Sequence, residues 1–286
     1  MSYPAEVTAA LKSELLCIAD SNWVLGHWYV NCMLNGRELT DFTSMAGIAE
    51  EKLGHARALF RFMEEHYGLA EHQLEFARSA AGIHSMALLD APPENWADFI
   101  VTLHLADQAL WRFSATLRTG DFAPVANLIT RFGEEAYFHQ LCIDGWLKAL
   151  DDGERHDLAA ALPARLPPVL KWFDGPDPDP LLEAGIRTEP LPQALEQLKA
   201  DIRRLIESVP ELSDEVLELT GSPAESAAWD AERRRPRGSA LPPRLWESMV
   251  PTSEEAKLAR RPLAVSVDDN IDLFGKVKKD ETEPQF

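Results

Sequence analysis

The feature that most constrains the fold is a pair of very long segments with helical periodicity near the start of the chain. Residues 5–33 and 38–67 repeat apolar side chains about every 3.6 residues and end at glycine-containing stops. At 1.5 Å per residue, each helix would be about 45 Å long, which is the length of helices in a bundle. Further helices are predicted at residues 71–81, 95–119, 124–150, 154–162, 167–173, 191–208 and 213–220. Since no useful alternating β pattern occurs, we expect an all-α bundle of long antiparallel helices with additional short C-terminal helices.

Two of the long segments carry a glutamate four residues before a histidine. The pairs are Glu51 with His55 and Glu135 with His139. Four-helix bundles that hold two iron or manganese ions use a related layout, with a Glu-x-x-His pair at i, i+3 on each of two helices and one carboxylate on each of the other two. Here the position three residues before each histidine holds Lys52 or Ala136 instead of glutamate. The pattern therefore indicates a two-metal bundle in which part of the ligand set has been replaced.

The apolar stripe of each segment indicates which of these side chains face the core. Lys52 and His55 lie on the stripe of 38–67, and His139 lies on the stripe of 124–150, whereas the two glutamates flank these stripes. Asp107 falls beside the apolar seam of 95–119. Because a buried carboxylate needs a partner, we expect Lys52, one of the histidines or a metal ion to contact it.

Charge and cysteine content narrow the class of protein. The 286 residues include 28 basic and 47 acidic side chains, for a net charge of −19, which argues against nucleic acid or an anionic membrane as the main partner. The three cysteines are odd in number and lie in apolar stretches, so we expect reduced thiols. No secretory signal pattern and no run of 18 apolar residues is present. We expect a cytoplasmic protein.

The composition changes near residue 221. We expect residues 1–220 to form the helical bundle and residues 221–286 to form an extended, partly disordered arm. The arm holds an arginine cluster at 233–235, which could dock on the acidic face of a partner or on phosphate. Simple solvation of the cluster is the favoured interpretation.

Two blocks of the sequence carry a resemblance to a known family. The first block, residues 16–57, includes Ile18-Ala19-Asp20, Leu25-Gly26-His27 and Leu53-Gly54-His55-Ala56-Arg57. The second block, residues 95–147, includes Asn95-Trp96-Ala97-Asp98 and Glu135-Ala136-Tyr137-Phe138-His139. Both resemble the non-catalytic C subunit of the bacterial phenylacetyl-CoA epoxidase. The resemblance implies a ferritin-like fold, no cofactor in this chain, and pairing with a homologous catalytic A subunit that holds a di-iron site.

The resemblance also implies where the ligands of that catalytic subunit would fall. The corresponding positions are Trp23, Lys52, His55, Asp107, Ala136 and His139. Three of the six retain a ligand residue type, and both glutamates of the Glu-x-x-His pairs are lost. We therefore expect a vestigial metal site that holds no metal, with Glu51 and Glu135 as candidate alternative ligands because i and i+4 share a helix face.

Three functions follow as hypotheses. The leading one is a structural subunit of a multicomponent aryl-CoA epoxidase, in which the partner inserts one oxygen atom of O₂ into the aromatic ring with electrons from an NADPH-linked reductase. The second is a metal-dependent oxygenase in its own right, which would use the two histidines, Asp107 and the flanking glutamates. The third is a homo-oligomeric scaffold with no connection to aryl-CoA.

Overall fold

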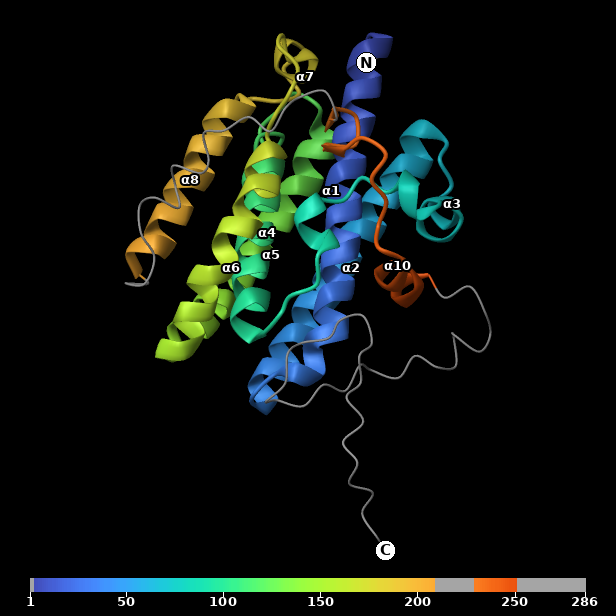
Figure 1. Cartoon of the computed structure of the whole chain (residues 1–286). Helices are drawn as coiled ribbons and strands as arrows, with labels where there is room; N and C mark the ends of the chain where they lie inside the picture. The colour runs from blue at the N-terminus through green and yellow to red at the C-terminus, as the bar shows by residue number, and fades with distance from the viewer. Residues whose placement is uncertain (1–2, 209–228, 251–286) are drawn as a thin grey trace, which may run out of the picture.

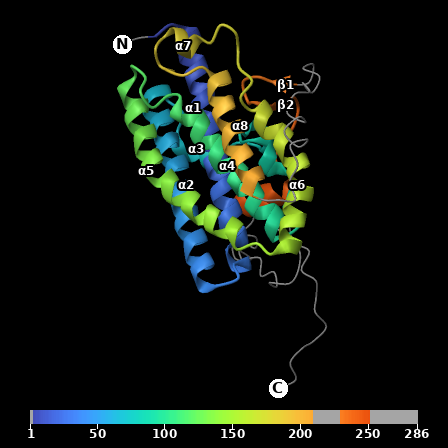
Figure 2. The same cartoon turned by 90° about the vertical axis from the view of Figure 1, so that its left-hand side faces the viewer.

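Long helices dominate the computed structural model, which describes residues 3–208 and 229–250 (Figure 1). The four helices that surround the centre are α1 (Ala5–Cys32), α2 (Leu39–Tyr67), α4 (Trp96–Ala115) and α5 (Ala123–Lys148). Two more helices, α6 (Asp152–Lys171) and α8 (Leu191–Ser208), pack against α4 (Figure 2). The all-α bundle predicted from periodicity is confirmed, and so is the ferritin-like fold that the resemblance implies.

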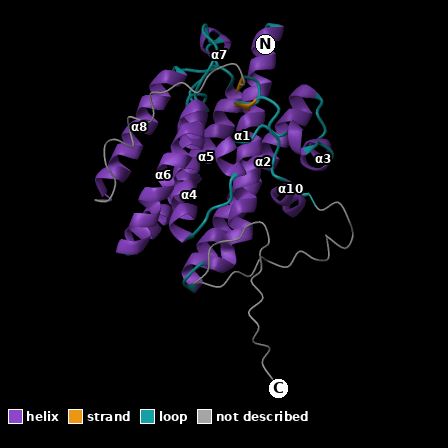
Figure 3. Ribbon diagram, in the orientation of Figure 1, coloured by secondary structure: helices purple, strands orange, loops and turns teal. Residues whose placement is uncertain are grey.

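Short elements connect and cover the long helices. They are η1 (Met33–Asn35), α3 (Glu71–Phe76), η2 (Ala80–Gly82), η3 (Ala87–Asp90), α7 (Pro180–Glu183), β1 (Trp229–Asp230), β2 (Arg235–Pro236) and α10 (Pro243–Met249). Figure 3 shows that helix accounts for almost all regular structure in the described part of the chain. In that part, β1 and β2 form a two-residue antiparallel ladder and no larger sheet occurs.

Local signals in the sequence account for several helix ends. Gly68 follows α2 at a φ of +67°, which favours glycine, and its N–H bonds to carbonyls of the last turn. The Asn95 side chain accepts a hydrogen bond from the N–H of Asp98 and so caps α4. Asp151 and Glu154 form a reciprocal capping box at the start of α6.

Two helix predictions are wrong. The segment 71–81, predicted as one helix, divides into α3, which ends at Phe76, and the short η2. The segments 154–162 and 167–173, predicted as two helices, belong to α6, which runs unbroken from Asp152 to Lys171. This helix contains Pro163, Pro167 and Pro168, although proline normally interrupts a helix. The leucine and valine side chains on one face of α6 are buried against the bundle. This burial compensates for the hydrogen bonds that the prolines remove.

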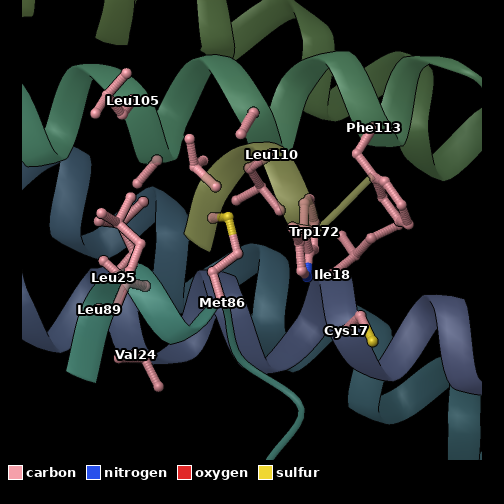
Figure 4. Packing of buried hydrophobic residues seen from close by; sticks show 14 of the residues in the cluster. Cys17, Ile18, Val24, Leu25, Met86, Leu89, Leu105, Leu110, Phe113 and Trp172 are labelled. Carbon is pink, nitrogen blue, oxygen red and sulfur yellow. The ribbon is translucent and has the colours of Figure 1, made fainter. Parts of the chain in front are cut away.

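The core lies around α1, which is buried along most of its length. Figure 4 shows side chains of α1 and α4 facing one another, with Met86 and Leu89 from the connecting segment and Trp172 from the end of α6 between them. Helices α1 and α2 approach closely at Gly26, where an added Cβ would lie 2.8 Å from Leu53 Cγ. That contact fixes the register of α1 against α2.

The segment 229–250, called the C-terminal strap below, corrects one expectation about the arm. The arginine cluster was expected to be solvated, but Arg234 and Arg235 are buried against the bundle. Arg234 contacts Glu14 of α1, and Arg235 contacts Asp90. The sequence could not predict the burial of these two arginines, because it does not show that acidic side chains from distant segments lie beside them. The helix predicted at 213–220 lies outside the described residues.

No helix in the described ranges combines the length and the apolar character that crossing a bilayer requires.

Candidate functional site

The centre of the bundle holds a group of polar side chains from all four long helices. Helix α2 contributes Lys52 and His55, α5 contributes His139, α4 contributes Asp107 and α1 contributes Tyr29. All five are buried. The sequence expected four of them here from the apolar stripes of their helices, and the structure brings those four together.

Lys52 and Asp107 form a buried ion pair. The Lys52 Nζ atom contacts Asp107 Oδ1, and both side chains are almost fully shielded, at 5% and 6% exposed. The second carboxylate oxygen of Asp107 accepts a hydrogen bond from the Tyr29 hydroxyl at 2.9 Å. Burial, followed by the charge of Asp107, raises the pKa of Tyr29 well above its ordinary value, so the hydroxyl stays a donor. The ammonium group thus supplies the positive charge next to this carboxylate.

The two Glu/His pairs connect crosswise between α2 and α5. His55 Nε2 contacts Glu135 of α5, and His139 Nε2 contacts Glu51 of α2. Each glutamate therefore binds the histidine of the other helix instead of the histidine four residues away on its own helix. The two imidazole centroids lie 6.5 Å apart. The crosswise contacts link the two antiparallel helices at two points.

Both histidines are neutral at pH 7. Burial, followed by the Lys52 ammonium, lowers the pKa of His55 to about 2 and that of His139 to about 3. The contact with a glutamate favours an imidazolium, but burial and the nearby ammonium oppose that charge more strongly. We therefore describe each contact as a neutral Nε2–H that donates to a carboxylate. Burial and the charge of Glu135 raise the pKa of Glu51.

Two predicted site residues do not contribute a ligand group at this centre. The Trp23 indole lies edge-on against Phe60 and Trp246, with centroids 6.3 and 6.2 Å away. Ala136 lies on α5 one turn before His139 and has no donor atom. Tyr29, six residues after Trp23, is the α1 side chain that reaches Asp107. Tyr29 was not predicted as a site residue, because the sequence does not show how α1 packs against α4, the helix that carries Asp107.

The carboxylates of this centre are engaged with neighbouring side chains. Asp107, Glu51 and Glu135 each contact a cationic or N–H group of another side chain. Throughout the described ranges, no group of three or more His, Cys, Asp and Glu side chains is arranged to hold a metal ion. The arrangement can link the four long helices and can hold protons on the Nε2 atoms of His55 and His139.

Comparison with known proteins gives one family. A family model described as "Phenylacetic acid catabolic protein" matches residues 2–209, which cover the described helices from α1 through α8. The C-terminal strap lies outside the matched residues. A search of curated proteins returned no match.

Proposed function

The chain belongs to the family of phenylacetic acid catabolic proteins, and within that family we propose that it is the non-catalytic subunit of a multicomponent aryl-CoA epoxidase. The family model does not separate the A subunit from the C subunit, so the assignment depends on the centre of the bundle. The observation that carries it is the buried Lys52–Asp107 ion pair.

The residues at the centre do not fit a two-metal site. A cationic side chain in contact with Asp107 would oppose a dication at the same carboxylate by like-charge repulsion. Ala136 offers no ligand atom, and Trp23 faces another part of the molecule. The remaining carboxylates, Glu51 and Glu135, already bind the imidazole N–H groups. These contacts support a structural role and disfavour an oxygenase that acts through this centre.

In the proposed complex, a homologous ferritin-like subunit holds the di-iron centre and oxidises the ring of an aryl-CoA thioester. An NADPH-linked reductase supplies its electrons. The present chain would stabilise that subunit by packing bundle against bundle. No step of the chemistry involves the Lys52–Asp107 pair, whose role is to keep this bundle folded.

The surface of α5 supports the existence of a partner. Tyr137, Phe138 and Leu141 are 63%, 62% and 50% exposed and lie within two turns of one another. Exposed large apolar side chains gathered in one place are typical of protein interfaces. These side chains make α5 the candidate interface helix. A permanent complex would bury roughly 2,000 Å² or more.

The first prediction concerns iron. After anaerobic reconstitution and desalting, we expect the purified chain to retain substantially less than one iron per polypeptide, because Lys52 and Ala136 stand where carboxylates are needed. Elemental analysis measures this. If the chain binds two irons tightly and turns over an aryl-CoA without a partner, it is itself the catalytic subunit.

The second prediction concerns the partner surface. We expect Phe138→Asp to abolish co-elution with the homologous catalytic subunit in size-exclusion chromatography, because a carboxylate would be buried without a counter-charge. Phe76→Asp is the matched control, since Phe76 is also exposed but lies at the end of α3. If the two variants co-elute equally with the catalytic subunit, the α5 surface is not the interface. This result would not affect the iron prediction, which elemental analysis tests independently.

A further inference from the structure

The four long helices differ in how much of their surface the rest of the chain covers. Helix α1 buries 18 of its 28 residues and α4 buries 15 of its 20, whereas α2 buries 10 of 29 and α5 only 6 of 26. The strap lies on α1, and α6 and α8 lie on α4. Figure 2 shows α2 and α5 along one edge of the molecule, opposite α6 and the strap. The described part of the chain therefore leaves one long face open, formed by α2 and α5.

Large apolar side chains are concentrated on these two helices. Five such side chains are exposed in the described residues, and four of them belong to α2 or α5, namely Leu39, Tyr137, Phe138 and Leu141. Leu39, at the start of α2, is the most exposed, at 78%. Single exposed apolar residues are common on a protein surface, but several on one face indicate contact with another molecule.

Three glycines inside α2 and α5 also lack an explanation within this chain. A Cβ atom added at Gly47, Gly54 or Gly145 would meet no atom of another described segment within 4 Å. At Gly133, by contrast, an added Cβ would lie only 2.4 Å from the Trp111 ring. Glycine destabilises the interior of a helix relative to alanine. A second helix that packs close to the backbone at these positions would explain why they hold glycine, because the distance between packed helices depends on the side chains at the contact.

A groove between α2 and α5 lies beside one of these glycines. Its volume is about 540 Å³, and Gly54, Ala58 and Leu128 are among the residues that line it. The charged lining residues carry both signs, and Arg57 pairs with Glu71 at 3.6 Å. The groove therefore does not select an ion of either sign, and its small and apolar residues favour packing against a side chain of another protein.

The area of the open face matches the requirement of a specific interface. The 26 residues of α5 give a length of about 40 Å at 1.5 Å per residue, and two helices side by side give a width of about 20 Å. The outline is therefore about 800 Å², which is the surface that each partner contributes to an interface of standard size. A partner that covers the face along its whole length needs no other contact to bind.

We propose that a homologous ferritin-like bundle docks lengthwise on the α2–α5 face, with one of its long helices packed along the groove beside Gly54. This inference depends on the proposed function, because that function supplies the partner. Side chains of the docked helix enter the groove next to Ala58 and Leu128, and Phe138 and Leu141 pack against its flank. The strap keeps the same partner off α1, since it already covers Trp23 with Trp246.

Gly54→Gln tests the proposal because it adds a side chain where the isolated chain has open space. The thermal midpoint of the isolated variant should stay the same or rise, since glutamine favours a helix more than glycine does. Its affinity for the homologous catalytic subunit, measured by isothermal titration calorimetry, should fall at least about tenfold, as expected when extra atoms enter a close-packed contact. A purely structural role for Gly54 would lower the thermal midpoint instead.

Ala160→Gln is the matched control, because it places the same side chain on the exposed surface of α6 and should leave the affinity unchanged. Gly47→Gln, two turns earlier on α2, should weaken binding in the same way as Gly54→Gln. It therefore keeps the test valid if Gly54→Gln does not fold.

Three results would contradict the proposal in different ways. If the unaltered chain does not bind the catalytic subunit, the proposed function is wrong and the partner named here is wrong with it. If the unaltered chain binds and both glycine variants bind equally well, only the docking face is wrong. If light scattering shows that the chain alone forms a dimer that Gly54→Gln dissociates, the face pairs two copies of this chain and does not receive the catalytic subunit.

Discussion

Replacing Lys52 by Met lowers the free energy of unfolding by about 3–5 kcal/mol, the cost expected when one partner of a buried ion pair is removed. The reason is that Asp107 would keep its charge in the core with only the Tyr29 hydroxyl as a partner. Urea unfolding followed by circular dichroism measures the change. The double variant Lys52→Met with Asp107→Asn should recover part of the loss, since the amide carries no charge and can still accept a hydrogen bond from Tyr29.

Lys148→Met is the matched control for this experiment. Lys148 is exposed on α5, so its replacement should change stability by no more than about 0.5 kcal/mol. If Lys52→Met behaves like Lys148→Met, the ion pair does not stabilise the bundle. The main argument for a structural centre would then be lost.

Arg234→Met should destabilise the protein by about 3 kcal/mol, although Arg234 lies outside the residues matched by the family model. Arg234 is buried, binds Glu14, donates to the Trp172 carbonyl at 2.9 Å, and lies 4.7 Å from the centre of the Phe113 ring. Burial alone would raise the pKa of Glu14, but Arg234 and Arg187 together lower it. Without Arg234, this carboxylate would keep a single charged partner.

Thermal and urea unfolding of Arg234→Met should be compared with Arg237→Met. Arg237 belongs to the same strap but is exposed, so its variant should stay within about 0.5 kcal/mol of the unaltered chain. Adding Glu14→Gln to Arg234→Met should restore part of the stability. Equal stability of the two arginine variants would mean that the strap contributes little to the fold.

Sequence patterns predicted helix boundaries well where interactions within the same helix determine those boundaries. The boundaries of the first two helices and the stop at Gly68 follow from periodicity and from the backbone freedom of glycine. The helix at 191–208 was predicted with the bounds that α8 has. In α6, however, burial of one helix face outweighs three prolines, and that energy depends on a neighbouring helix that local patterns do not include.

At the centre of the bundle, too, local patterns predicted some features, and others depended on tertiary packing. Helical periodicity was enough to predict that Lys52, His55 and His139 point inward, and charge balance was enough to predict that Lys52 could pair with Asp107. The crosswise contacts of Glu51 and Glu135 were not predicted, because the sequence does not define the register between two antiparallel helices. Trp23 was named from the resemblance alone, and Tyr29 was not predicted because the sequence does not show which α1 side chain reaches Asp107.

The sequence by itself determined where the long helices lie, which of their faces are apolar and that Lys52, His55 and His139 face the core, because these depend on residues within a few turns of one another. The tertiary structure alone decided which of those side chains meet, where the strap arginines bind and where α5 remains exposed. These features depend on contacts between residues 55 to 220 positions apart. Such contacts form only when helices pack at one particular register, which is chosen by the packing energy of the whole bundle.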